Sequence, residues 1–142
     1  MAMSYSASRT IDADPEKVFA LLTDAKSYAS WNPAVLSLAG TIAPGEKIRL
    51  VSVVNPKRTF TLTVTEVDCP SRMVWADGMP LGLFKGVRTY SLRPVAGGRT
   101  EFTMAEVFSG PLAPLITKAI PDMTESFEMF ADGLKSAAES RA

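Results

Sequence analysis

The stretch that decides the fold is a pair of matched segments joined by two glycines. Residues 84–94 read FKGVRTYSLRP, residues 99–109 read RTEFTMAEVFS, and Ala-Gly-Gly stands at 96–98. Small, flexible residues between two segments of alternating apolar side chains are typical of a β-hairpin. A register symmetric about Gly97 places three pairs opposite each other: Arg88 with Glu106, Tyr90 with Met104, and Leu92 with Phe102.

Further strands are predicted on the N-terminal side of this hairpin. Residues 47–54 and 58–67 are rich in Val, Ile, Leu and Thr, with the turn residues Asn-Pro-Lys at 55–57 between them. In the second run, apolar side chains alternate with threonines, as in a sheet with one face on a core and one in water. The remaining strand candidates are 4–13, 34–42 and 72–77.

Two short helices are predicted between the first strand and the rest of the sheet. Asp14 can cap a helix whose first position is Pro15, and Glu16 favours the positive end of the helix. A second short segment starts at Asp24 and carries Tyr28 and Trp31. It ends at Asn32-Pro33, because the residue before a proline is pushed out of the α region.

A long amphipathic helix is predicted at the C-terminal end. From Gly110 to Lys135 the apolar residues recur at threes and fours, which gives one broad stripe to bury. Pro121 cannot continue a straight helix, so we expect a kink or two separate pieces there. The stripe consists of Leu112, Leu115, Ile116, Ala119, Ile120, Met123, Phe127, Phe130 and Leu134.

These elements predict an α+β fold in a single domain spanning residues 1–142. A curved antiparallel sheet of six or seven strands wraps around the long C-terminal helix, and the two short helices follow strand one. The apolar face of the sheet and the apolar stripe of the helix must cover each other.

The composition excludes several kinds of chemistry. The chain has no histidine, which removes Ser-His-Asp and Cys-His catalysis and His-ligated zinc. Lys and Arg together number 15, as do Asp and Glu, so no basic excess favours nucleic acid. Cys69 is the only cysteine, and no stretch reaches the length of a membrane span. We expect a cytoplasmic protein with no metal, no cofactor and no stable membrane insertion.

The order of elements resembles the START-like superfamily, also called the birch-pollen-allergen or SRPBCC superfamily, and within it the bacterial polyketide cyclase/dehydratase-like group. The residues that carry the resemblance are Ile11–Asp24, Trp31-Asn32-Pro33, the segment from Pro70 to Trp75, Leu92-Arg93-Pro94, Gly97–Thr100 and the amphipathic last helix. The resemblance implies a helix-grip fold with a cavity between sheet and helix. It also implies binding of apolar small molecules such as lipids, quinones, sterols or polyketides. Some members are cyclases, dehydratases or hydrolases, and others act on protein partners.

The inward-facing side chains are the candidate ligand-binding residues. Each of them also fits ordinary core packing, because large apolar residues are normally buried. As a set, and mainly because the START-like resemblance implies a cavity, they predict a pocket of about 300–1,000 Å³, the usual range for small ligands. The candidates are Trp31, Phe60, Trp75, Phe84, Arg88, Tyr90, Met104, Glu106, Phe108, Met123, Phe127 and Phe130.

Arg88 and Glu106 are the two charged members of this set. Their neighbours two positions away are apolar, so both side chains should point inward, within about 4 Å of each other. A buried charge is costly unless it is paired. The pair could anchor a polar group of a ligand, it could be a structural salt bridge, or the two side chains could extend to the solvent at the sheet edge.

Three functions stay open from the sequence. The first is a carrier or sensor that binds a small hydrophobic ligand in the cavity. The second is a cyclase, dehydratase or hydrolase that uses Glu106, Tyr90 and Arg88, although no catalytic residue can be assigned. The third is a protein-interaction module.

Tyr28 and Trp31 could form a lid with the apolar loop 78–83, or Trp31 could close the end of the core.

Overall fold

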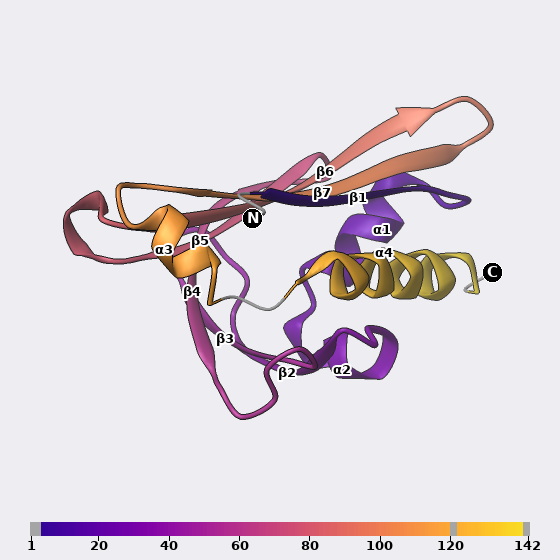
Figure 1. The fold of residues 1–142 in the computed structure, drawn as a ribbon. Helices are drawn as coiled ribbons and strands as arrows, with labels where there is room; N and C mark the ends of the chain where they lie inside the picture. Colours follow the sequence, from indigo (N-terminus) through magenta and orange to yellow (C-terminus); the bar gives the residue numbers. More distant parts are fainter. Residues whose placement is uncertain (1–3, 120–121, 141–142) are drawn as a thin grey trace.

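A single curled sheet and a C-terminal helix dominate the computed structural model, which describes residues 4–119 and 122–140 (Figure 1). The short helices lie at the two ends of the sheet and beside the long helix. In chain order the elements are β1 (Ser4–Ile11), α1 (Pro15–Leu22), the 3-10 helix η1 (Ala25–Ser27), α2 (Tyr28–Trp31), β2 (Val35–Gly40), β3 (Lys47–Ser52), β4 (Phe60–Asp68), β5 (Arg72–Gly78), the 3-10 helix η2 (Pro80–Gly82), β6 (Lys85–Val95), β7 (Arg99–Ser109), α3 (Ala113–Thr117) and α4 (Thr124–Glu139).

The sheet has seven antiparallel strands in the order β1-β7-β6-β5-β4-β3-β2. Strands β2 to β7 therefore form a meander, and β1 joins the far side of β7 across almost the whole chain. The predicted hairpin register is confirmed: Leu92 pairs with Phe102, and Arg88 pairs with Glu106. The sheet curls around α4 as a half-barrel, so the predicted α+β architecture is confirmed.

Local sequence signals position the first helices. The backbone N–H of Lys17 donates to Asp14 Oδ1 at 2.9 Å, which caps α1 as predicted. Tyr28 in α2 is fully buried, and its hydroxyl donates to the carbonyl of Leu22. The sequence alternation in β4 holds as far as Val64, where a β-bulge shifts the register before Glu66.

Helix α4 lies against the concave face of the sheet and is attached at both sides. On one side, Arg9 of β1 donates from Nε to Asp132 Oδ1 at 2.7 Å and from Nη2 to Glu128 Oε2 at 3.0 Å. On the other side, Gly133 lies directly against the backbone that follows α2. A Cβ at Gly133 would come within 2.6 Å of both the Trp31 carbonyl oxygen and Pro33 Cδ.

The predicted C-terminal helix is divided into α3 and α4. Pro121, at which we expected the kink or break, lies outside the described residues. The prediction that Leu115 and Ala119 belong to the buried stripe is wrong, because both residues are exposed, Leu115 by 68%. Ile120, another predicted member of the stripe, lies outside the described residues. Helix α3 is tied to the β5–β6 loop, where the N–H of Leu112 donates to the carbonyl of Leu83 at 2.9 Å, and it does not continue the line of α4 (Figure 1).

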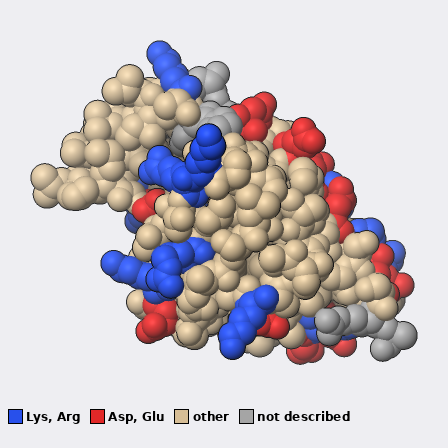
Figure 2. Space-filling view, turned by 90° about the horizontal axis from the view of Figure 1, so that it is seen from below, with Lys and Arg blue, Asp and Glu red and all other residues tan. Residues whose placement is uncertain are grey.

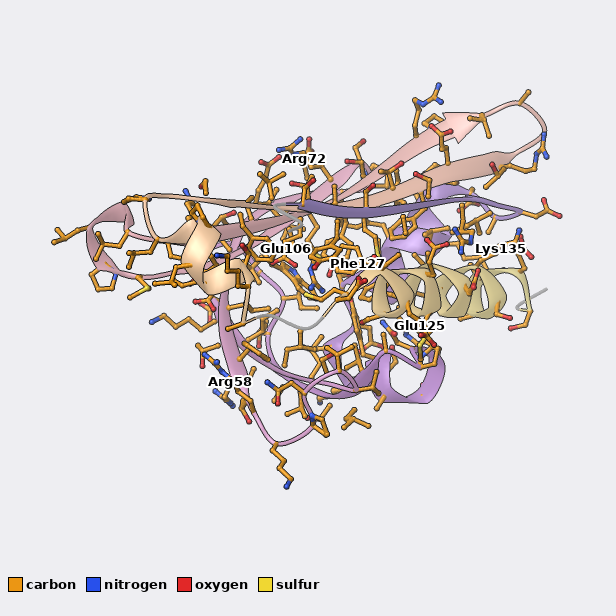
Figure 3. All side chains as sticks on the ribbon, viewed as in Figure 1. Arg58, Arg72, Glu106, Glu125, Phe127 and Lys135 are labelled. Atoms are coloured by element: carbon orange, nitrogen blue, oxygen red, sulfur yellow. The ribbon has the colours of Figure 1, made fainter. Side chains whose placement is uncertain are left out.

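The core fills the space between the sheet and helices α1, α2 and α4. Its largest fully buried members are Trp75, Tyr28, Tyr90, Phe102, Phe127 and Phe130. Figure 3 shows Glu106 and Phe127 in the space between the sheet and α4, whereas Arg72 lies on the outer face of the sheet. None of the helices within residues 4–119 and 122–140 combines the length and the apolarity that crossing a membrane requires.

Candidate functional site: a cavity between sheet and helix

A cavity of about 210 Å³ lies between the concave face of the sheet and the N-terminal end of α4. This volume lies below the predicted range of about 300–1,000 Å³, so the predicted volume is wrong. Large side chains account for the difference, because Trp75, Phe127 and Phe130 fill much of the enclosed space while forming the wall. The lining is mostly apolar, as the sequence predicts for the inner face.

Ten of the twelve candidate residues line this cavity. They are Phe60, Trp75, Phe84, Arg88, Met104, Glu106, Phe108, Met123, Phe127 and Phe130. Tyr90 is fully buried and does not line the cavity itself; the centre of its ring lies 4.9 Å from that of Trp75, which does. Trp31 packs on Tyr28 at 4.9 Å and on Phe130 at 5.9 Å, at the end of the core and outside the lining. These contacts agree with the interpretation in which Trp31 closes the end of the core.

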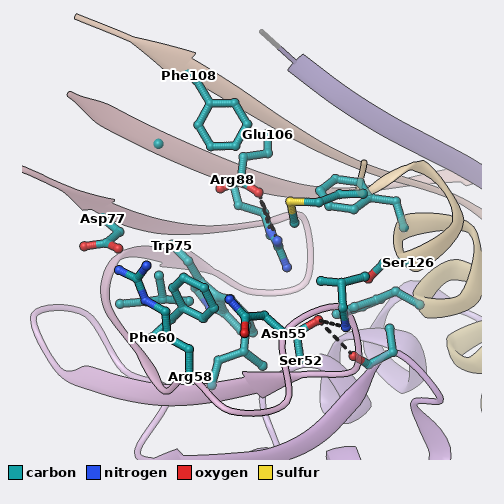
Figure 4. A pocket seen from close by; sticks show the side chains of 18 of the residues that line it. Ser52, Asn55, Arg58, Phe60, Trp75, Asp77, Arg88, Glu106, Phe108 and Ser126 are labelled. Atoms are coloured by element: carbon teal, nitrogen blue, oxygen red, sulfur yellow. Dashed lines mark hydrogen bonds and ion pairs between the residues drawn. The ribbon is translucent and has the colours of Figure 1, made fainter. Parts of the chain in front are cut away.

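The ion pair between Arg88 and Glu106 is present on the inner face (Figure 4). Glu106 Oε1 accepts from Arg88 Nη2 at 2.9 Å and from Arg88 Nε at 3.2 Å. The side chains are 12% and 14% exposed, respectively. The predicted contact is therefore confirmed, and both charges belong to the cavity wall.

The guanidinium of Arg88 is fixed by three neighbours. Besides Glu106, its Nη1 lies 3.5 Å from the Tyr90 hydroxyl, and its Cζ stands 4.8 Å from the centre of the Phe127 ring. Burial acts against the positive charge, but Glu106 and Tyr90 outweigh it, and the pKa of Arg88 lies above the usual arginine value. Burial raises the pKa of Tyr90 to about 12, against the opposing effect of Arg88. Both groups therefore stay protonated at neutral pH.

One carboxylate oxygen of Glu106 stays available. Its Oε1 takes both bonds from Arg88, while Oε2 accepts no hydrogen bond within the described residues. Gly86, one register step along β6, leaves the room that Oε2 occupies. A Cβ there would lie 3.3 Å from Oε2 and 3.2 Å from Phe108 Cε1.

The opening of the cavity carries a second set of charges. Arg58 and Asp77 are exposed and lie at one end of the pocket, away from Ser126 (Figure 4). The guanidinium of Arg58 covers the Phe60 ring at 4.7 Å. With Arg88 and Glu106, the lining holds two positive and two negative side chains, so its net charge is zero.

The wall also contains an unpaired donor. The indole Nε1–H of Trp75 is buried and has no acceptor among the residues that the structure describes. An unsatisfied buried donor costs about 1–3 kcal/mol. The folded state therefore bears this cost.

Several lining residues were not predicted. Gly86 shares the parity of Phe84 and Arg88, so strand alternation could have indicated it. Asn55 and Arg58 come from the β3–β4 turn, which folds back over the opening, and no local pattern signals such a return. Ala34, Val35, Leu50, Ser52, Val54, Leu62, Asp77, Ile116, Ala119 and Ser126 complete the lining.

The geometry supports recognition better than proton transfer. The cavity offers apolar contact on most sides, an acceptor at Glu106 Oε2 and donors on Arg88. Within the described residues, no group of three His, Cys, Asp or Glu side chains could hold a metal ion.

The fold and cavity define a class of protein: a START-like helix-grip domain. Solved structures of this architecture include a START superfamily protein from Mycobacterium smegmatis, with a TM-score of 0.71, 16% identity, and coverage of 99% of this chain and 100% of that one. A protein from Rhodobacter sphaeroides is 25% identical, with a TM-score of 0.74 and coverage of 100% of this chain and 95% of that one. A hypothetical protein from Helicobacter pylori has a TM-score of 0.76 at 15% identity, covering 95% and 87% of the two chains.

The sequence itself assigns the family. Residues 2–139 match the model of the polyketide cyclase / dehydrase and lipid transport family, and the chain belongs to that family. No curated protein matches the sequence. The resemblance to the SRPBCC superfamily and its polyketide cyclase-like group is thereby confirmed.

Proposed function

We propose that the cavity binds a compact, mostly apolar ligand with an uncharged polar head, as a carrier or sensor. The observation that supports this most is the Arg88–Glu106 pair, which places one free acceptor and further N–H donors in a mostly apolar wall. A hydroxyl group of a phenol, alcohol or hydroxyketone could donate to Glu106 Oε2 and accept from Arg88. The apolar body would then lie against Trp75, Phe127 and Met104.

The charge balance of the lining favours a neutral head over a carboxylate. Glu106 already neutralises Arg88 at 2.9 Å, so an anionic head placed at this pair would meet the negative charge of Glu106, while the other cation of the lining, Arg58, lies at the opening. The volume of about 210 Å³ favours a single or fused small ring or a short chain over a whole sterol.

A reaction on the bound ligand has less support in the site. The high pKa of Arg88 and the pKa of about 12 for Tyr90 keep both groups from acting as a base at neutral pH. Glu106 accepts two bonds from Arg88 and is better placed to hold a proton donor than to remove a proton. We therefore propose binding in preference to cyclase, dehydratase or hydrolase activity.

Two measurements test this proposal. Native mass spectrometry of protein purified from its own host should show a bound small molecule of constant mass, and a mass that changes on incubation would indicate turnover instead. Titration with three probes of one shape should then give the order 2-naphthol, naphthalene, 2-naphthoate, from tightest to weakest. If naphthoate binds most tightly, the neutral-head proposal is wrong. If none of the three displaces or fills the site, ligand binding in this cavity is wrong.

A further inference from the structure

The end of the molecule beside the cavity opening carries apolar side chains that nothing in the described chain covers. Leu81 in η2 is 96% exposed, and Leu115 in α3 is 68% exposed. Met79 and Leu83 in the same loop are exposed as well. The loop was already unusual in the sequence, because loops of this kind are normally polar.

These side chains form one surface rather than two. The N–H of Leu112 donates to the carbonyl of Leu83, and a Cβ on Gly110 would lie 2.7 Å from that same carbonyl oxygen. The start of α3 is therefore in contact with the η2 loop. We define the apolar tip as Met79, Leu81, Leu83 and Leu115.

Neither backbone geometry nor packing within the chain explains Leu81. Its φ of 61° lies in the left-handed region, which leucine adopts reluctantly and Gly, Asn or Asp adopt more readily. A leucine that is 96% exposed gains nothing from the core. The side chain has a role only if something outside the described chain covers it.

The charges around the apolar tip point to an anionic partner. Residues 78–85 and 109–119 contain Lys85 and Lys118 and no Asp or Glu, and the exposed Asp77 directly precedes the first of these ranges. Both lysines are exposed. Figure 2 shows an uncharged projection at the left, with several Lys and Arg side chains and an acidic side chain close to its base. Apolar side chains flanked by lysines suit a bilayer surface with negative headgroups.

The tip is also continuous with the cavity. Phe84 follows Leu83 directly and Ile116 follows Leu115, and both Phe84 and Ile116 line the cavity. The tip therefore adjoins the cavity lining in sequence at two places.

We propose that the apolar tip docks on an anionic lipid bilayer, with Leu81 and Leu115 entering the headgroup region and Lys85 and Lys118 contacting the headgroups. The proposal rests on the surface rather than on the Arg88–Glu106 site. Docking and cavity binding can therefore fail independently.

Flotation with vesicles tests the proposal. The chain should float with phosphatidylcholine vesicles that contain phosphatidylglycerol, and less with phosphatidylcholine alone. Leu81→Asp with Leu115→Asp should lower the bound fraction, since each buried leucine is worth about tenfold in partitioning. Asp is tolerated at a left-handed position, so the first change does not strain the loop. Lys85→Gln with Lys118→Gln should remove the preference for the anionic vesicles only.

A matched control and two contrary outcomes complete the experiment. Leu36→Asp changes a leucine that is 49% exposed on β2, far from the tip in Figure 1, and should float like the unaltered chain. The proposal would be overturned if the chain floated with neither kind of vesicle. A dimer detected by mass photometry, together with absent vesicle binding, would also overturn it if Leu81→Asp with Leu115→Asp dissociates that dimer, because the tip would then cover a second copy.

Discussion

Arg88 and Glu106 face each other across the β6–β7 hairpin and form an ion pair with two hydrogen bonds in the wall of the cavity. Arg93 and Glu101 form the corresponding pair toward the hairpin turn, on the outside of the sheet, with exposed side chains. The same hairpin thus contains a buried and an exposed version of one interaction. The comparison separates the effect of burial from that of the pair itself.

The buried pair should be the costlier one to break. Arg88→Met leaves Glu106 as an uncompensated charge and should lower the free energy of unfolding by about 3–5 kcal/mol. Arg88→Met combined with Glu106→Leu should recover much of that loss. Arg93→Met, as the exposed control, should cost no more than about 1 kcal/mol. Urea unfolding measures all three variants, and equal costs for Arg88→Met and Arg93→Met would contradict the prediction.

Filling the space beside Glu106 should weaken ligand binding without unfolding the chain. A methyl group at Gly86 would press on Oε2 and on the Phe108 ring, both of which end flexible side chains. Gly86→Ala should therefore lower the affinity for 2-naphthol while the urea midpoint changes little. Ser91→Thr adds a methyl group to the same strand outside the lining and should bind as the unaltered chain does. Unchanged affinity in Gly86→Ala would mean that the ligand does not use Oε2.

Burial of Tyr90 should make the fold sensitive to alkaline pH. The folded pKa of about 12 lies above the ordinary value of 10.0, so the folded state keeps its proton while the unfolded chain loses it. The contribution of Tyr90 to the free energy of unfolding should therefore be fully present below about pH 10 and fall as the pH rises from 10 toward 12. In Tyr90→Phe the alkaline loss of stability that Tyr90 causes should disappear. A similar loss caused by Tyr28 should remain, because burial also raises the pKa of Tyr28. Urea unfolding at pH 8 and at pH 11 measures the difference.

Gly133 should resist replacement by a better helix former. Alanine normally stabilises a helix relative to glycine by about 1 kcal/mol. At Gly133 the new Cβ would come within 2.6 Å of the Trp31 carbonyl oxygen, and backbone atoms cannot move aside cheaply. Gly133→Ala should therefore lower the thermal unfolding midpoint, whereas Ser136→Ala, on the exposed side of α4, should leave it unchanged or raise it slightly. A raised midpoint in Gly133→Ala would show that α4 does not pack on this backbone.

The sequence predicts the hairpin with its register because the signal is local. A tight Gly-Gly turn and two alternating strands leave little freedom, and Arg88 opposite Glu106 follows directly from them. The ten lining residues predicted from strand parity and helix period follow in the same way. What could not be predicted depends on how distant segments meet. The return of Arg58 over the opening, the exposure of Leu115 and the small volume of the cavity are set by tertiary packing. The α3–α4 division was foreseeable, but the attachment of α3 to Leu83 was not.

The position of β1 at the edge of the sheet has a consequence for synthesis of the chain. Ser4 pairs with Val107 and Ile11 pairs with Thr100, so the first strand made has only the last strand as its neighbour. At the usual rate of translation, about 5–20 residues per second, some 5–20 s pass before that neighbour exists. Such distant pairing gives a high contact order and slow folding. On the ribosome, the residues of β1 therefore have no partner strand until β7 has been made, while β2 to β6 can already pair with one another.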